Sequence, residues 1–189
     1  VTLSTEQLAY GQQRMLEVGM QDRVDLRLQD YRDIQDGPFD AICSIEMLEA
    51  VGQAYWPTYF SHVHRLLKSG GRACIQSIVI DDKLFDRYAQ GTDFIQQYIF
   101  PGGCLPSAAH IRDQAQRAGL RVEAEFAFGQ DYAETLRRWQ HNFQQQQTKV
   151  LAQGFDTRFL DTWAFYLAYC EAAFSMRNIE VVQFTLIKD

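Results

Sequence analysis

The sequence lacks any long apolar run, any basic start followed by an apolar stretch, and any C-x-x-C pair. A membrane-spanning helix needs about eighteen or more consecutive apolar residues, so none is predicted, and neither is a secretory signal. Three of the four cysteines lie in apolar runs, and the four are scattered along the chain at Cys43, Cys74, Cys104 and Cys170. This usage predicts reduced core thiols and a cytoplasmic protein.

Several catalytic signatures are also missing. There is no G-x-S-x-G motif and no Cys/His dyad to indicate a hydrolase, and no two histidines share metal-ligand spacing with a cysteine or carboxylate, so we expect no metal site. The formal net charge of −6 argues against a general affinity for nucleic acid. Because an acidic chain is not attracted to anionic lipid, any membrane contact must come from a local patch.

The chain can bury one sizeable core, since 47% of its 189 residues are hydrophobic and 13% are aromatic. Buried strands separated by amphipathic helices predict an α/β sheet with parallel members in a single domain. A glutamine run at residues 144–147 is expected on a solvated helix face. The expected strands are 24–28, 39–45, 72–80, 121–128 and 181–187, and the expected helices are 5–18, 55–67, 82–99, 108–118, 132–151 and 156–175.

Residues 98–107 read YIFPGGCLPS and place two prolines, two glycines and several large apolar residues in ten positions. Gly102 and Gly103 are predicted to adopt backbone angles closed to other residues, and the prolines fix φ. Ser107 is a candidate cap for the helix that follows. Apolar side chains on such a rigid loop are expected to line a pocket.

This segment resembles the corresponding decapeptide of the cyclopropane-fatty-acyl-phospholipid synthase family, which comprises S-adenosylmethionine-dependent methyltransferases that act on unsaturated acyl chains. The resemblance implies a Rossmann-like class I methyltransferase fold with helical lid insertions, and a last strand that runs antiparallel to its neighbours. It implies one methyltransferase domain over residues 1–189, with an acyl-binding lid at roughly 82–118 and 132–175. The similarity continues at residues 28–33, 44–52, 131–136 and 165–170.

The sequence begins at Val1 and contains no G-x-G pattern. In the family, a strand and a glycine-rich loop that hold the methionine part of S-adenosylmethionine come just before a "GVTLS"-like segment. We therefore expect this chain to be the C-terminal part of a longer protein, with that first strand and loop absent from it.

Asp30 and Tyr31 follow a predicted strand, where ligands lie in doubly wound sheets. The resemblance implies that they contact the adenine of S-adenosylmethionine, and that Thr2 and Gln7 contact its ribose. A carboxylate accepts from amine or hydroxyl donors, and an aromatic ring packs on a base. The residues alone leave a second interpretation open, in which Asp30 caps a helix and Tyr31 is exposed.

Glu46 and Glu49 come directly after the predicted strand 39–45 and lie three residues apart, on one side of any helical turn. The resemblance implies that Glu49 helps to bind a bicarbonate ion together with Gln76, the backbone of Ile78 and the hydroxyl of Tyr132. Without the resemblance, both glutamates are expected to face solvent, and Tyr132 is expected to pack at the start of a helix.

The family commonly has histidine where this sequence has Ala50 and Gln76. Glutamine donates a hydrogen bond to an anion, but it neither titrates nor brings positive charge. Glu49 likewise cannot attract an anion by charge, so it must share or donate a proton, and this role requires a raised pKa.

The second half of the chain is rich in aromatic residues at helical spacing, which predicts core packing for most of them. Tyr166 and Tyr169 are the candidates for stabilising a cationic intermediate, because an aromatic face attracts a nearby cation by roughly 0.5 to 2 kcal/mol.

The resemblance implies methyl(ene) transfer from S-adenosylmethionine to the cis double bond of a phospholipid acyl chain. A carbocation would form, and bicarbonate would remove a methyl proton so that a cyclopropane ring closes. The alternatives are a methyl-branched lipid product, transfer to a small amine, and a non-catalytic lipid-binding fragment. We expect a cytoplasmic protein whose partners are phospholipid acyl chains, reached by peripheral contact with the inner membrane face. A homodimer is one alternative for its oligomeric state. No nucleic acid is expected to bind.

Overall fold

The computed structural model describes residues 1–189, which divide into two compact units, Val1–Pro38 and Phe39–Asp189. The first unit contains α1 (Thr5–Glu17) and the short 3-10 helix η1 (Tyr31–Asp33). Ser4 caps α1 by accepting a hydrogen bond from the backbone N–H of Gln7, as the sequence indicates.

The expected strand at 24–28 is wrong. Only Leu28 pairs, in an isolated bridge with Thr2. Val24 and Leu28 are both exposed, so this segment has no apolar face buried against a neighbour, and alternation alone does not hold a strand in place.

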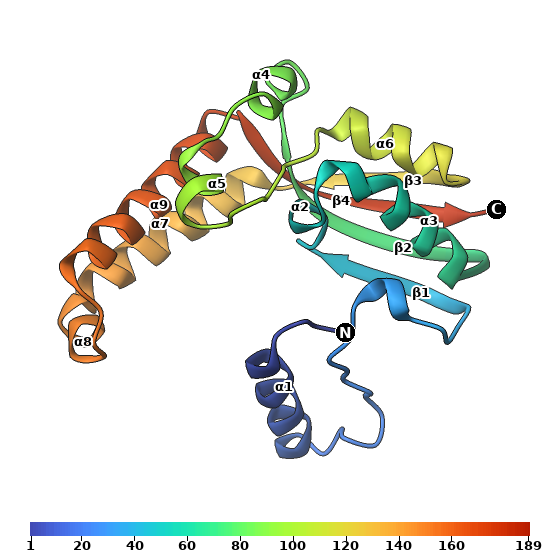
Figure 1. Ribbon diagram of the computed structural model, residues 1–189, viewed down its shortest axis with the longest axis horizontal. Helices are drawn as coiled ribbons and strands as arrows, with labels where there is room; N and C mark the ends of the chain where they lie inside the picture. The colour runs from blue at the N-terminus through green and yellow to red at the C-terminus, as the bar shows by residue number, and fades with distance from the viewer. The chain divides into compact units, whose positions relative to one another are not determined.

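The second unit is built on a four-stranded sheet in the order β1-β2-β4-β3 (Figure 1). Strand β1 runs parallel to β2, and β4 runs antiparallel to both β2 and β3. The predicted α/β sheet with an antiparallel last strand is therefore confirmed. The strands span Phe39–Ile45 (β1), Leu67–Ile80 (β2), Leu120–Ala127 (β3) and Ile179–Lys188 (β4).

Helices α3 (Trp56–Leu66) and α6 (Ala108–Arg117) lie on one face of this sheet (Figure 1). Alternate residues of β2 point to that face, and Ala73 and Ile75 are fully buried there. Their register partners on β4, Leu186 and Phe184, are buried as well. This side of the sheet forms the main core, because strand alternation sends every second side chain to it.

A helical hairpin extends from the sheet (Figure 1), in which α7 (Gly129–Gln145) packs along α9 (Thr157–Ser175). The sequence predicts one helix over 132–151, but the structure breaks it at Gln146 into α7 and the short α8 (Gln147–Ala152). The glutamines at 144–147 are exposed, as expected. The hairpin joins the sheet through a cluster of buried apolar residues, namely Ala133, Leu136, Leu167, Phe174 and Val181.

The single helix expected over 82–99 is also wrong, because two short helices stand there, α4 (Phe85–Ala89) and α5 (Phe94–Tyr98). A turn containing Gly91 separates them, and Asp93 and Gln96 then form a reciprocal capping box that starts α5 anew. The remaining helical turns are α2 (Leu48–Val51) and η2 (Gln53–Tyr55).

All four cysteines are unpaired thiols, but the expectation of core burial is wrong for Cys43, which is exposed. Cys43 and its register partner Cys74 lie on the sheet face opposite α3 and α6. None of the helices combines the length and the apolar character required to cross a lipid bilayer.

Candidate functional site

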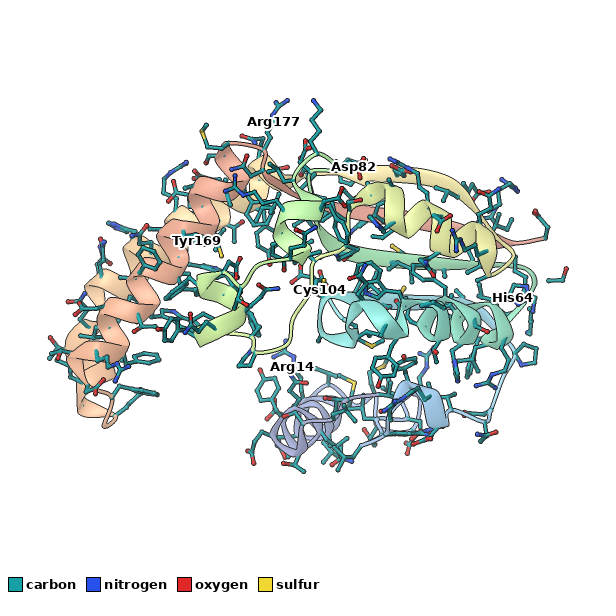
Figure 2. All side chains as sticks on the ribbon, turned by 45° about the horizontal axis from the view of Figure 1, so that its top comes forward. Arg14, His64, Asp82, Cys104, Tyr169 and Arg177 are labelled. Atoms are coloured by element: carbon teal, nitrogen blue, oxygen red, sulfur yellow. The ribbon has the colours of Figure 1, made fainter.

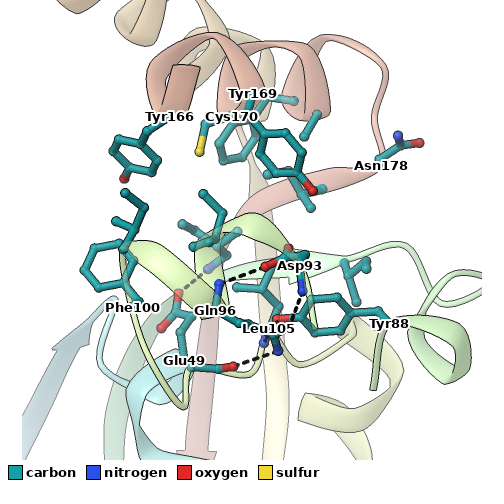
Figure 3. A pocket seen from close by; sticks show the side chains of 18 of the residues that line it. Glu49, Tyr88, Asp93, Gln96, Phe100, Leu105, Tyr166, Tyr169, Cys170 and Asn178 are labelled. Carbon is teal, nitrogen blue, oxygen red and sulfur yellow. Dashed lines mark hydrogen bonds between the residues drawn. The ribbon is translucent and has the colours of Figure 1, made fainter. Parts of the chain in front are cut away.

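A cavity of about 900 Å³ lies in the second unit, at the carboxyl ends of β1 and β2. Its walls come from α4, α5, the 98–107 loop, α7 and α9, and Figure 3 shows Tyr166, Tyr169 and Cys170 of α9 facing Phe100 and Leu105. Most lining groups are apolar. Its volume and character match a site for a small molecule or an acyl chain.

The decapeptide loop lines this cavity, which confirms its predicted role. Two backbone hydrogen bonds connect the loop to α2 and to β2. The Cys104 N–H donates to the carbonyl of Glu49 in α2 at 2.8 Å, and the N–H of Ile80 in β2 donates to the Pro106 carbonyl at 2.9 Å. Figure 2 places Cys104 in this loop and Tyr169 on α9. Ser107 caps α6, as predicted, by accepting from the N–H of His110.

The two glycines of the loop have different reasons to be glycine. Gly102 has φ of 81°, in the left-handed region that the sequence predicts. Gly103 does not have a positive φ, so the prediction is wrong there. A Cβ on Gly103 would lie 3.1 Å from the Phe100 carbonyl oxygen, and the position needs glycine because the backbone approaches closely.

Glu49 is the buried carboxyl group of the cavity. Its Oε1 accepts from the N–H of Ile78 at 2.5 Å, whereas its Oε2 is buried without a hydrogen-bond partner. Burial raises the pKa of Glu49, and the N–H groups of Glu49 and Ile78 only partly oppose this rise. The raised pKa expected for this residue is therefore found, and the arrangement suits a carboxyl group that holds a proton.

A second carboxylate, Glu46, accepts hydrogen bonds from two other residues predicted for the site, Tyr132 and Gln76. The hydroxyl of Tyr132 donates to both Glu46 oxygens at 3.3 Å, and the Gln76 amide donates to Oε1 at 2.9 Å. The Gln183 side-chain amide, on the neighbouring strand β4, donates in turn to the side-chain Oε1 of Gln76 at 2.9 Å. The structure thus places Glu49, Ile78 and Tyr132 on the cavity wall, and Glu46 links Gln76 to Tyr132 by hydrogen bonds.

Tyr132 packs at the start of α7, as the residues alone predict, and its hydroxyl contacts Glu46. Its ring packs against Phe174 with centroids 4.9 Å apart, while its hydroxyl reaches Glu46. Burial, followed by the charge of Glu46, raises the pKa of Tyr132 far above its ordinary value. Tyr132 therefore remains a neutral hydrogen-bond donor at physiological pH.

Tyr166 and Tyr169, the aromatic candidates, both line the cavity. Tyr166 meets Phe100 edge-on at 6.4 Å, and burial raises the pKa of Tyr166 to about 12. The ring centroids of Tyr169 and Phe94 are 6.2 Å apart. Two electron-rich rings on one wall of an apolar cavity can stabilise a cation there.

The expected S-adenosylmethionine residues lie in the first unit. Thr2 donates through Oγ1 to the Gln7 side chain at 2.7 Å, and its backbone pairs with Arg27 and Gln29. Asp30 caps η1 and forms an ion pair with Arg32 at 2.7 Å. The half-buried Tyr31 follows it.

Glu46 and Gln183 belong to the hydrogen-bonded cluster, although neither has a role predicted from the sequence. The available signal for Glu46 is its place directly after β1 and three residues before Glu49. The left-handed backbone of Glu46, with φ of 51°, is a stronger indication of a functional position, but only the structure reveals it. Gln183 is found only through its pairing with Gln76 across β2 and β4.

Known proteins resemble the chain over nearly its whole length. It is 43% identical to the tuberculostearic acid methyltransferase UfaA1 of Mycobacterium tuberculosis over 192 residues, covering all of this chain and 44% of that protein. It is 37% identical to the cyclopropane-fatty-acyl-phospholipid synthase of Escherichia coli K12 over 183 residues, covering 97% of this chain and 45% of the relative. The chain therefore spans less than half the length of either relative.

The fold is matched by the mycolic acid cyclopropane synthase CmaA1 solved with SAH and CTAB, with a TM-score of 0.85 and 27% identity over 99% of this chain and 68% of that one. This confirms the expected methyltransferase fold class. The family model described as "Mycolic acid cyclopropane synthetase" matches residues 1–184. The chain belongs to the mycolic acid cyclopropane synthetase family.

Proposed function

We propose that this chain carries out S-adenosylmethionine-dependent methyl(ene) transfer to the cis double bond of an unsaturated phospholipid acyl chain. The observation that carries the proposal is an apolar cavity of about 900 Å³ whose wall holds Glu46, Glu49 and Tyr132 together. An alkene needs an apolar slot, and its reaction needs a few polar groups at one place. Family membership supports the same chemistry.

The methyl donor fits the polar and aromatic groups of the first unit. Thr2 and Gln7 offer hydroxyl and amide groups, Asp30 offers carboxylate oxygens, and Tyr31 offers a partly buried ring. We propose that these four residues hold the ribose and adenine of S-adenosylmethionine. When bound, this molecule supplies an electrophilic methyl group.

The cavity walls then protect the acyl chain after transfer. A carbocation on that chain reacts readily with water, so an apolar enclosure preserves it. Tyr166 and Tyr169 present aromatic faces to the same space. We assign them the stabilisation of positive charge and assign protonated Glu49 a hydrogen bond donated from its otherwise unpartnered Oε2.

The residues expected to bind bicarbonate do not fit that ion as they are arranged. Gln76 and Tyr132 already donate to Glu46, and Ile78 N–H already donates to Glu49. A second anion would lie beside the Glu46 carboxylate, where like charges repel. No step of the proposed reaction is therefore assigned to bicarbonate.

We propose the acyl-binding lid within the segments 82–118 and 132–175 of a single methyltransferase domain. The cavity-lining helices α4, α5, α7 and α9 support this assignment, whereas α6 packs on β3 and α3. Phe100 lines the cavity and is also 58% exposed, and the neighbouring Tyr98 is 57% exposed. We assign this apolar pair the peripheral contact with the cytoplasmic face of the membrane, as one local patch on an acidic chain.

A methyl-branched lipid is the second candidate product. Gln76 does not titrate, and the relative that is 43% identical is named a tuberculostearic acid methyltransferase. Both products begin with the same methyl transfer, and the proton that the carbocation loses separates them. Loss from the new methyl group closes the ring, whereas loss from a neighbouring chain carbon, or loss after a hydride shift that leaves a methylene group, gives a branched alkene without any reductant.

The test is incubation of the full-length protein with phospholipids bearing a cis double bond and with methyl-labelled S-adenosylmethionine. Mass spectrometry of the released fatty acids is expected to show label with a gain of one CH2, and chromatography separates a cyclopropane from a methylene-bearing chain. Saturated phospholipid is the control and is expected to remain unlabelled. Label on a small amine, or no label on lipid, contradicts the proposal.

A further inference from the structure

The Glu46 carboxylate sits at the centre of the polar cluster. It accepts hydrogen bonds from two neutral side-chain donors, the Tyr132 hydroxyl at 3.3 Å and the Gln76 amide at 2.9 Å. These are two of the groups expected to hold a bicarbonate ion. The chain's own carboxylate thus receives the hydrogen bonds that such an ion would need.

The backbone holds Glu46 in a costly conformation. A φ of 51° in a residue other than glycine costs about 1–2 kcal/mol, and such strain is retained most often at functional positions. The N–H of Glu46 donates to the Gln76 carbonyl at 2.8 Å, which fixes this conformation at the end of β1. Both the main chain and the side chain of Glu46 are therefore bound to Gln76.

Glu46 and Glu49 differ in what they can do with a proton. Glu49 is buried, with one oxygen on Ile78 N–H, and burial disfavours its ionised form. Glu46 is exposed and lines the cavity wall, and its carboxylate accepts hydrogen bonds from two neutral donors, the Gln76 amide and the Tyr132 hydroxyl. Tyr132 cannot compete as a base, because its hydroxyl stays protonated.

We propose that Glu46 is the internal base of this site and removes the proton that bicarbonate is expected to remove. This inference rests on the proposed function. After methyl transfer, a C–H bond of the transferred carbon breaks, and its electron pair forms the C–C bond that closes the ring on the cationic carbon. The proton goes to the Glu46 carboxylate and from there to solvent. No oxidant or reductant is needed.

The experiment uses the full-length protein in bicarbonate-depleted and bicarbonate-supplemented buffer. Wild-type turnover is expected to be the same in both. Glu46→Gln keeps the size of the side chain and an acceptor for Tyr132, but it cannot accept the proton, so cyclopropane formation is expected to fall about 100-fold. Release of S-adenosylhomocysteine is expected to fall less, so the ratio of this product to cyclopropane rises.

A binding measurement accompanies the assays. In 13C NMR of labelled bicarbonate, wild-type protein is expected to leave the line width unchanged. Glu46→Asp retains a carboxylate and is expected to retain part of the activity, while Glu6→Gln, an exposed change on α1, is the matched control. Circular dichroism checks that each variant is folded.

The outcomes separate the two proposals. If wild-type protein releases S-adenosylhomocysteine with unsaturated lipid but loses at least tenfold of its turnover without bicarbonate, or broadens the bicarbonate line, the internal base is refuted and the proposed function stands. Unchanged cyclopropane formation in Glu46→Gln refutes the base in the same way. If the wild type releases no S-adenosylhomocysteine, the proposed function fails, and the base fails with it.

Discussion

The backbone N–H of Cys104 donates a hydrogen bond to the carbonyl of Glu49 at 2.8 Å. This bond joins the glycine-containing loop to the peptide that carries the buried carboxyl group of the cavity. A residue 55 positions further along the chain therefore fixes the position of Glu49, and the geometry of the loop becomes part of the geometry of the site.

Gly103→Ala tests this coupling. The new Cβ would lie 3.1 Å from the Phe100 carbonyl oxygen and 3.7 Å from that of Glu49, so the loop must shift. We expect the free energy of unfolding to fall by about 1–2 kcal/mol and turnover to fall with it. Urea unfolding followed by circular dichroism measures the first effect.

Gly91→Ala is the matched control, because Gly91 also lines the cavity and has no positive φ, and a Cβ added there would have no neighbouring atom nearer than 3.6 Å. It is expected to leave stability unchanged or slightly increased. Equal losses in the two variants would show that the close approach at Gly103 is unimportant.

Glu49→Gln has a pH-dependent effect on stability. Burial raises the folded-state pKa of Glu49 above its ordinary value of 4.5, so the native state favours the protonated form. That contribution is fully present below the unfolded pKa and is lost as the pH rises through the folded pKa. As the pH rises above 4.5, the wild type is therefore expected to lose stability relative to the variant. The free energy of unfolding of the variant minus that of the wild type becomes more positive.

Chemical denaturation at a series of pH values measures this difference, with the exposed Glu6→Gln as control. A difference for Glu49→Gln that stays constant with pH would contradict a raised pKa. Turnover of Glu49→Gln is expected to stay within about tenfold of the wild type, because the glutamine amide still donates a hydrogen bond into the cavity, whereas Glu49→Ala, which has no donor, is expected to lose about 10- to 100-fold.

Tyr132→Phe removes one hydroxyl and keeps the ring that packs on Phe174. Losing a hydrogen bond to a carboxylate is worth about 1.5–3 kcal/mol, so turnover is expected to fall roughly 10- to 100-fold. The dissociation constant of S-adenosylmethionine is expected to change little, since Tyr132 belongs to the polar cluster around Glu46 on the cavity wall and not to the residues proposed to hold that molecule. Steady-state kinetics measures the turnover, and titration calorimetry measures the dissociation constant of S-adenosylmethionine.

The exposed Tyr10→Phe on α1 is the control for Tyr132→Phe and is expected to keep the turnover within about twofold. If Tyr132→Phe weakened donor binding as much as it slowed turnover, its assignment to the polar cluster would be wrong.

Cys170→Trp tests the acyl slot, because Cys170 lies on the cavity wall (Figure 3) and an indole would occupy part of the space. Turnover with long acyl chains is expected to fall more than turnover with short ones. Leu151→Trp, at an exposed position on α8, is the control. A uniform loss with all chain lengths would indicate misfolding or a slot elsewhere.

Local signals were sufficient for much of this molecule. The YIFPGGCLPS run predicted a shaped loop beside a pocket, because proline and glycine restrict the backbone in ways that do not depend on distant residues. The strands at 39–45 and 72–80 were likewise readable from their apolar runs. The prediction of a single helix at 82–99 was wrong, because amphipathic spacing does not show that Gly91 and the capping box of Asp93 divide the segment into two helices.

The sequence by itself determined the family, the α/β sheet and the pocket loop, and it singled out Glu49, Gln76 and Tyr132 but gave no role to Glu46 or Gln183. Only the tertiary structure decided which of those residues bond to one another. Gln76 and Tyr132 are 56 positions apart and meet on Glu46, because β2 and α7 converge at the end of β1. The raised pKa of Glu49 has the same origin: the loop and helices that cover its carboxyl group, and not its own residue type, remove it from water.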